Sequence, residues 1–304
     1  MSKIKVKILE TALLVRAGVS VVFVAISYLL RHFFAPTQRG FFREDMCIRH
    51  SFKPETIQFK QFNAVAILAT IFVLTLGEFA MNMRAGERFD DLNCRWYWRQ
   101  RLVQMLRFTT IWLLGMAINT FFLNLFKQSV GSLRPYFVKL CEPVDIATGL
   151  AIDDTTFDAN HFFNNYTCSN SNLHQEVDAR HSFYSGHASS AFFFATFLVL
   201  YIHARILPNC RRCFSFFFAL YALPFGAASF VTMTRLSEHR SHSVDIVFGA
   251  LAGIAVAVCM VFFHRDQFFT ATLAADGKSE SGSNRKSASS KPSNGFDLGN
   301  YLIF

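Results

Sequence analysis

Three short polar blocks hold most of the side chains in this sequence that could do chemistry. The first block (127–135) contains two cations, the second block (182–187) a Ser-Gly-His turn, and the third block (234–245) arginines, histidines and an aspartate. Cationic side chains and the free N–H groups at the start of a helix bind anions, and histidine beside a carboxylate transfers protons or acts as a nucleophile. These residue types together predict a site for a tetrahedral dianion such as phosphate.

Long apolar segments must position the three blocks. Hydrophobic residues make up 52% of the 304, and 37 residues are Phe, which is typical of an integral membrane protein. A helix needs about 20 apolar residues to cross the bilayer core, and six segments approach or reach that length. These segments are 13–33, 63–82, 106–126, 187–204, 214–233 and 243–263. We therefore expect an all-α membrane protein whose six transmembrane helices form a bundle.

The chain divides into a short N-terminal segment (1–12), the membrane domain (13–264) and a tail (265–304). The tail is rich in Ser, Lys, Gly and Asn without periodicity, and we expect it to be disordered. Lys and Arg are more numerous on the side of the termini, which predicts that both termini are cytoplasmic. The net charge is +9, and the Lys and Arg residues lie between the hydrophobic segments, as membrane topology explains. We therefore expect the bilayer as a partner and no nucleic acid.

Because successive spans reverse direction, the three blocks fall together on the non-cytoplasmic side and can share one pocket. Its phosphate-binding groups would be Lys127, Arg134, Arg235, Ser185 and the backbone of Gly186. Lys127 and Arg134 are seven residues apart, which is two turns if the segment stays helical. Cations and amides can neutralise a phosphate by themselves, so we expect no metal and no cofactor.

The same pocket would contain groups for proton transfer, namely His187, His239, His242 and Asp245. An isolated Ser-Gly-His has a simpler interpretation, in which Ser185 only caps a helix and His187 is an interfacial histidine. The convergence of three polar blocks on one side of the membrane favours the site.

The segment between the first and second blocks is long and polar, as expected of a cap over a site. Cys141 and Cys168 both lie in it and can pair, because this side of the membrane is not the reducing cytoplasm. Asn165 begins an Asn-Tyr-Thr glycosylation sequon in the same segment, which agrees with the topology.

The blocks resemble the signature motifs of the phosphatidic acid phosphatase type 2 superfamily. These motifs are a Lys followed seven residues later by Arg-Pro, a Ser-Gly-His, and a Ser-Arg with His and Asp six and ten residues after that Arg. The first two are matched in full, by Lys127, Arg134-Pro135 and 185–187. Residues 39–42 with Asp45, 55–57 and 182–184 further resemble the lipid phosphate phosphatase branch, and the resemblance runs from about residue 10 to 264.

The resemblance implies a role for each matched residue. Lys127, Arg134 and Arg235 would bind phosphate, Ser185 and Gly186 would donate to it, and His187 would protonate the leaving alcohol. A histidine of the third motif would attack phosphorus and form a phosphohistidine, while Asp245 holds its imidazole. The implied substrates are phosphatidate, lysophosphatidate, ceramide 1-phosphate and sphingosine 1-phosphate, hydrolysed without magnesium at the extracellular face of the plasma membrane. The resemblance and the small residues of 243–263 are also compatible with a homo-oligomer.

The third motif departs from the pattern at the nucleophile. Ser241 stands where the motif has histidine, and Thr234 replaces its Ser. His242 is one residue late, and one position turns a helical side chain by about 100°. His239 lies three residues before His242 and ranks below it as a nucleophile, because it is farther from Asp245 in the sequence.

Three functions therefore remain open. The first is an active lipid phosphatase that uses His242 or a relaxed loop. The second is a family member with impaired turnover that binds or sequesters lipid phosphates. The third is a transporter or channel unrelated to phosphate chemistry. An internal membrane with a lumenal site fits the sequence as well as the plasma membrane does.

Overall fold

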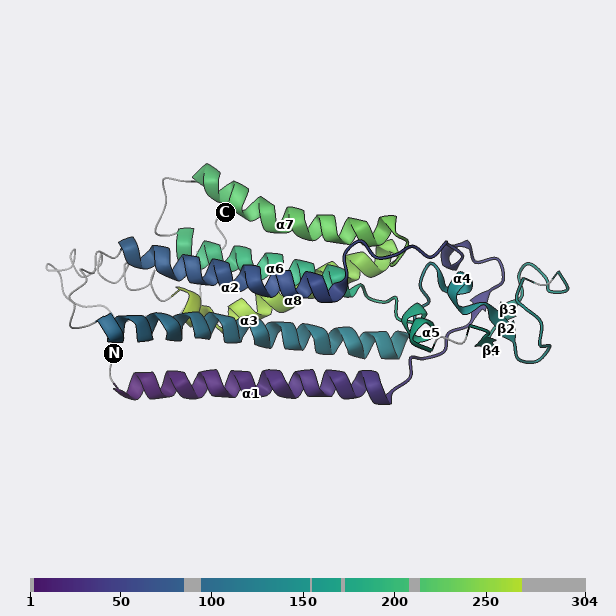
Figure 1. Ribbon diagram of the computed structural model, residues 1–304, viewed down its shortest axis with the longest axis horizontal. Coiled ribbons are helices and arrows are strands. Elements are labelled where there is room, and N and C mark those ends of the chain that lie inside the picture. The colour runs from purple at the N-terminus through teal and green to yellow at the C-terminus, as the bar shows by residue number, and fades with distance from the viewer. Residues whose placement is uncertain (1–2, 85–93, 154, 171–172, 208–213, 270–304) are drawn as a thin grey trace, which may run out of the picture.

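The computed structural model describes residues 3–84, 94–153, 155–170, 173–207 and 214–269. In Figure 1 the long helices lie side by side, and shorter elements form a cap at one end. The long helices are α1 (Lys3–Phe33), α2 (Phe59–Arg84), α3 (Cys94–Val130), α6 (Gly186–Tyr201) with its π-helical continuation η3 (Ile202–Ile206), α7 (Phe214–Ser237) and α8 (Ser243–Phe263). The cap contains β1 (Phe41–Phe42), the 3-10 turn η1 (Met46–Ile48), α4 (Phe137–Cys141), β2 (Pro143–Asp145), β3 (Phe162–Phe163), β4 (Tyr166–Cys168) and α5 (Leu173–Ala179).

The expected helical membrane architecture is confirmed. Within the described residues, five helices are long and apolar enough to cross a bilayer, over Thr11–Phe33, Phe59–Phe79, Leu102–Val130, Gly186–Ile206 and Ser243–Phe263. The remaining predicted span, 214–233, lies within α7, which is not one of the five, so the count of six stays a prediction. α1 already begins at Lys3, so most of the N-terminal segment predicted for 1–12 continues the first helix. The predicted tail lies outside the described residues from 270 onward.

α6 is the central helix of the bundle. It packs against α2, α3, α7 and α8, and 61% of its spanning segment is buried, compared with 6% for α1. Small residues allow the closest contact, because a Cβ on Gly249 would lie 2.6 Å from the Ser185 carbonyl oxygen and one on Gly253 2.1 Å from that of Ser189. The α6 and α8 backbones therefore touch close to where the second and third blocks end.

The end of α3 corrects one expectation from the sequence. The helix stops at Val130, because Gly131 takes a positive φ of 56° and lies so close to Thr37 that a Cβ would be 1.8 Å from its carbonyl oxygen. Lys127 is therefore in the last helical turn, and Arg134 lies beyond the helix. The two cations do not share a helix face.

The cap has a small core of its own. Strand β1 pairs antiparallel with β3, and β2 pairs antiparallel with β4. Phe41, Tyr136, Phe137, Phe163 and Tyr166 are buried between these strands, α4 and α5.

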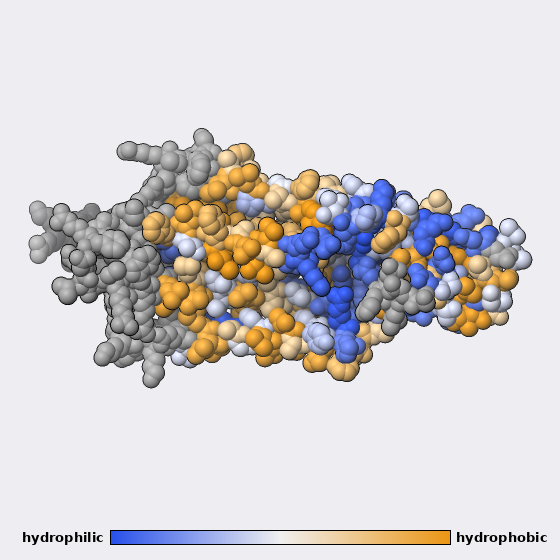
Figure 2. All heavy atoms as spheres, in the orientation of Figure 1, coloured by the Kyte–Doolittle hydropathy of each residue, from blue (hydrophilic) through white to orange (hydrophobic). Residues whose placement is uncertain are grey.

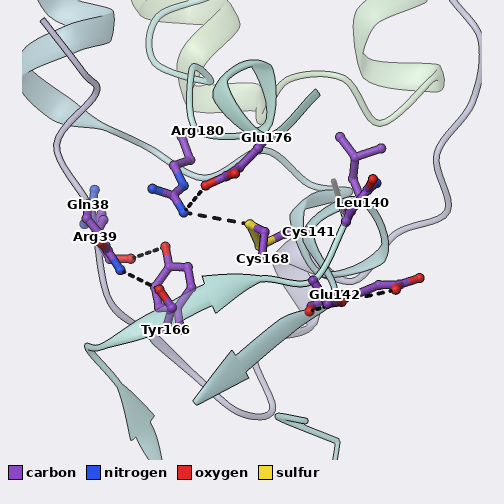
Figure 3. The surroundings of a disulfide bond; sticks show 11 residues. Gln38, Arg39, Leu140, Cys141, Glu142, Tyr166, Cys168, Glu176 and Arg180 are labelled. Atoms are coloured by element: carbon purple, nitrogen blue, oxygen red, sulfur yellow. Dashed lines mark hydrogen bonds and ion pairs between the residues drawn. A yellow bond between two sulfur atoms is a disulfide. The ribbon is translucent and has the colours of Figure 1, made fainter. Parts of the chain in front are cut away.

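A disulfide joins Cys141 of α4 to Cys168 of β4, the pair considered from the sequence. Figure 3 shows Arg180 beside it, paired with Glu176 at 2.8 Å. Asn165, the first residue of the sequon, is exposed beside β4 in the same cap.

The surface agrees with a membrane-embedded bundle beneath a polar cap. Figure 2 shows hydrophobic side chains over the long helices and a hydrophilic band where these helices end next to the cap. The three polar blocks lie at that end, since α3 finishes there and α6 and α8 begin there.

Candidate functional site

The three blocks meet where the helices join the cap. The backbone N–H of Ser182 donates to the carbonyl oxygen of Ser132 at 3.0 Å, which ties the second block to the first. The guanidinium of Arg134 donates to the carbonyl oxygen of Arg240 at 3.2 Å, which ties the first block to the third. The structure thus assembles the candidate site from segments more than 40 residues apart.

Asp245 connects the second and third blocks. Its carboxylate accepts hydrogen bonds from the Ser182 hydroxyl and from the backbone N–H of His242, the latter at 3.1 Å. Its own carbonyl oxygen accepts the backbone N–H of Ser185 at 3.0 Å. Asp245 is only 3% exposed, and these bonds hold the starts of α6 and α8 together.

The imidazole of His242 contacts the first block. Its Nε2 lies 3.0 Å from the carbonyl oxygen of Leu133, and a carbonyl can only accept, so Nε2 carries the proton. The lone pair is then on Nδ1, and the side chain accepts from the backbone N–H of Asp245 in the capping box that begins α8. The Asp245 carboxylate contacts His242 through the backbone N–H, so the carboxylate does not orient the ring as it usually does beside a histidine. Ser241 next to it is 7% exposed.

Ser185 and His187 lie in the first turn of α6. The Ser185 hydroxyl caps the helix by accepting from the backbone N–H of Ala188 at 3.5 Å. His187 Nε2 lies 3.1 Å from the carbonyl oxygen of Ile57, so in the neutral ring Nε2 carries the proton and Nδ1 the lone pair. The Phe59 ring packs against the imidazole with centroids 5.1 Å apart. The segment before α2 therefore positions His187.

Arg134 is held by a carboxylate of α5. It pairs with Asp178 at 2.8 Å, and the Tyr136 hydroxyl donates to the same carboxylate at 2.9 Å. Burial alone would raise the pKa of Asp178, but Arg134, Lys127 and the Tyr136 hydroxyl outweigh it and hold that pKa below its ordinary value. Burial raises the pKa of Tyr136 to about 12, so its hydroxyl stays protonated and donates.

Two glutamates contact the arginines of the third block. Glu238 pairs with Arg235 at 2.8 Å and accepts the backbone N–H of Thr56 at 2.9 Å. Glu55 lies 3.2 Å from Arg240 and 3.6 Å from Arg235. A phosphate that binds Arg235 must therefore compete with carboxylates already present.

Charges in the site are balanced among the described residues. The Lys127 ammonium interacts electrostatically with Asp178 and Asp245. The cations are Lys127, Arg134, Arg235 and Arg240, and the carboxylates are Asp178, Asp245, Glu55 and Glu238.

Sequence reasoning missed Asp178, Tyr136, Glu238 and Arg240. Glu238 and Arg240 lie inside the third block, and their charges are the feature of the sequence that could have identified them as site residues. Asp178 sits in the cap segment with no motif around it. His239 was considered but lies apart from this network, with its ring stacked on His50 at 4.2 Å. No group of three or more His, Cys, Asp or Glu that could hold a metal occurs in the part of the chain the structure describes.

An apolar cavity of about 200 Å³ lies between α2, α3 and α6, next to the phosphate-site residues. Phe59 lines it and also contacts His187, so the cavity adjoins the second block. Its other lining residues are Asn63, Ala66, Ile67, Trp112, Leu113, Met116, Thr120, Ser190 and Phe194.

Comparison with known proteins places this geometry in context. Residues 108–269, more than half of the chain, match the PAP2 superfamily. The chain is 29% identical over 239 residues to phospholipid phosphatase 2 of Mus musculus, covering 77% of this chain and 79% of that protein. It is also 29% identical to phospholipid phosphatase 2 of Homo sapiens, with 77% and 76% covered, and 25% identical to phospholipid phosphatase 1 of Mus musculus, with 77% of each covered. No solved structure matches the chain.

Proposed function

Because the chain belongs to the PAP2 superfamily, we propose that it is a phosphatase of lipid phosphate monoesters that works at the three converging blocks. The observation that carries the proposal is the Asp245 network, which brings the Ser-Gly-His turn and the third block into one site. The relatives named phospholipid phosphatase support the same reaction class. The lipid would be phosphatidate, lysophosphatidate, sphingosine 1-phosphate or ceramide 1-phosphate.

Phosphate would bind to Lys127, Arg134 and Arg235, with donors from Ser185 and Gly186. Among the arginine–carboxylate pairs of the site, the longest distance joins Arg235 to Glu55 at 3.6 Å. Phosphate would replace Glu55 there, because a charge-assisted bond to a dianion is stronger than a distant carboxylate contact. The adjoining apolar cavity would receive the part of the hydrocarbon chain nearest the headgroup.

In the reaction the Nδ1 of His242 would leave the backbone N–H of Asp245 and attack phosphorus. The bond from phosphorus to the alcohol oxygen breaks as the nitrogen bond forms, and His187, protonated at Nδ1 beforehand as an imidazolium, gives that oxygen its proton. Water then attacks the phosphohistidine and passes a proton to His187, which releases phosphate and restores both histidines. Asp245 would position His242 through the backbone N–H.

A specific observation favours a second candidate, a family member that binds lipid phosphates but turns them over poorly. Ser241 occupies the usual place of the nucleophile, and the His242 ring is bonded to the carbonyl of Leu133 rather than to the carboxylate of Asp245. A nucleophile must lie within about 3–3.5 Å of the reacting atom and in line with the leaving group. Binding alone tolerates larger displacements.

Phosphate release from lysophosphatidate by the purified protein, without magnesium, separates the two candidates. Activity that is lost in His242→Ala supports the phosphatase. No release by the wild type, together with retained binding of the lipid and a large gain in Ser241→His, supports the impaired binder. Absence of both release and binding in a folded protein would overturn both.

The site would face the extracellular side, or the lumen of an internal membrane, with both termini cytoplasmic. The disulfide and the exposed Asn165 support this orientation, since both lie in the cap and both suit an oxidising compartment. Loss of a glycosidase-sensitive mass shift in Asn165→Gln, relative to wild type from the same cells, tests it.

A further inference from the structure

A second group of charged side chains lies at the end of the bundle opposite the phosphate site. It consists of Arg16 of α1, Glu78 of α2, Arg107 of α3 and Arg205 of η3, and we call it the arginine cluster. All four residues lie within or at the end of a membrane-spanning segment, near the end that is farthest from the cap. None of them takes part in the proposed reaction.

The one carboxylate of the arginine cluster is fully engaged. Glu78 is 1% exposed, and its oxygens accept from the Arg205 guanidinium at 3.1 and 3.2 Å. The Tyr201 hydroxyl donates to the same carboxylate at 3.1 Å. Glu78 is therefore hydrogen-bonded to Arg205 and Tyr201, and it acts on Arg107 only through the electrostatic field.

Arg16 and Arg107 carry positive charge that the Arg205–Glu78 pair does not neutralise among the described residues. Arg16 Nη1 and Arg107 Nε are buried and have no hydrogen-bond partner in the part of the chain that the structure describes. Arg107 also experiences the like charges of Arg16 and Arg205, against the single carboxylate of Glu78. Three described cations beside one carboxylate favour the binding of an anion.

The place of the two arginines suits a phospholipid headgroup. Arg16 of α1 and Arg107 of α3 lie toward the ends of these helices that are farthest from the cap. A long guanidinium side chain near the end of a membrane helix can reach the headgroup region.

The surface of α1 next to the arginines suits the rest of a lipid. An open groove of about 430 Å³ is lined by Thr11, Ala12, Val15 and Arg16. Exposed Leu14 and Val15 continue an apolar surface beside it. A soluble anion gains nothing from this surface, whereas acyl chains do.

We propose that the arginine cluster binds the headgroup of an anionic phospholipid in the leaflet opposite the phosphate site. Arg16 and Arg107 donate to its phosphate oxygens, and the acyl chains lie along α1. Such a lipid is a phosphodiester, so it is a structural ligand and not a substrate of the proposed monoester hydrolysis.

The test uses the full-length protein purified in a neutral detergent and titrated with phosphatidylglycerol or phosphatidylcholine while Tm is measured. Ligand that binds only the folded state raises Tm with its concentration. We expect a saturable rise with phosphatidylglycerol and none with phosphatidylcholine. Arg107→Gln and Arg16→Gln should each weaken the apparent affinity about tenfold, because each removes a charged hydrogen bond.

Arg265→Gln is the matched control, because it removes an exposed cation just beyond α8 and should leave the affinity unchanged. Without lipid, Arg107→Gln should not lower Tm, since it relieves repulsion within the cluster. An equal response to phosphatidylcholine, an equal response to inorganic phosphate, or unchanged affinity in both variants would each overturn the proposal. If Arg107→Gln fails to fold, Arg16→Gln decides alone.

Discussion

His242 donates from Nε2 to the carbonyl oxygen of Leu133 at 3.0 Å. The first block therefore holds the ring of the histidine that directly follows Ser241 in the sequence. The carboxylate expected to orient that ring instead binds the backbone N–H of His242. The lone pair is on Nδ1, so the Leu133 carbonyl and the Asp245 backbone N–H orient the ring, and the Asp245 carboxylate does not.

His242→Ala should abolish phosphate release, by about 10²-fold or more, if the Nδ1 of His242 is the nucleophile. His242→Gln keeps a side-chain donor at the place of Nε2 for Leu133 without a nucleophilic nitrogen, and it should be equally inactive with an unchanged Tm. Initial rates and thermal melts of both variants measure this. Substantial activity in His242→Gln would assign the ring a structural role only.

Glu55→Gln should strengthen binding of phosphate or vanadate several-fold. The carboxylate contacts Arg240 at 3.2 Å and Arg235 at 3.6 Å, so removing its charge frees positive potential for the ligand. Inhibition constants for vanadate measure the effect, and Glu44→Gln, an exposed acid in the same connection, is the control. Weaker binding in Glu55→Gln would mean that Glu55 mainly holds the arginines in place.

His181 should make the protein less stable in acid. Burial, followed by the charges of Lys127, Arg31 and Arg134, lowers its pKa from 6.5 to about 3, and its Nε2 contacts Gln128 at 3.2 Å. In the unfolded chain the imidazole takes up a proton near pH 6.5, and in the folded protein it stays neutral until about pH 3.

The stability from His181 is therefore complete above pH 6.5 and is lost progressively as the pH falls toward 3. His181→Gln keeps a donor and an acceptor but cannot titrate, so its Tm should fall less steeply between these pH values. Thermal melts of both proteins across that range give the difference in slope. Parallel curves would show that His181 titrates normally.

Gly253→Ala should lower Tm, because the new Cβ would lie 2.1 Å from the Ser189 carbonyl oxygen and push α8 away from α6. Overpacking of this kind costs about 1–3 kcal/mol. Gly226→Ala in α7 has nothing within 4 Å of the added Cβ and should be neutral or slightly stabilising. Equal melts for the two variants would argue against close α6–α8 contact.

Ala66→Leu should raise the KM for long-chain lysophosphatidate several-fold and leave kcat nearly unchanged. Ala66 is buried and lines the cavity beside His187, so the larger side chain removes room for the hydrocarbon. Ala64→Leu places the same side chain on the exposed face of α2 as a control. A short-chain phosphate monoester should be unaffected, and an equal change in its KM would contradict an acyl-binding cavity.

The membrane class, the approximate helices and the three blocks were predictable from the sequence. Hydropathy and motif spacing are local properties, and a span of apolar residues forms a helix in a bilayer whatever its neighbours are. Alternation of spans also places the blocks on one side. The residue types of the blocks predict a phosphate site, and the resemblance of the motifs implies lipid phosphates as substrates.

Only the tertiary structure decided which partners the site residues have. Glu238 accepts from Thr56 across 182 residues, and Arg134 reaches Asp178 across 44. Such pairs cannot be predicted from sequence distance or residue type, because only the fold of the connecting loops brings the partners together. The close approach of Gly131 to Thr37 likewise ends α3 before Arg134, and the Leu133 carbonyl that this places near the third block helps to orient the His242 ring.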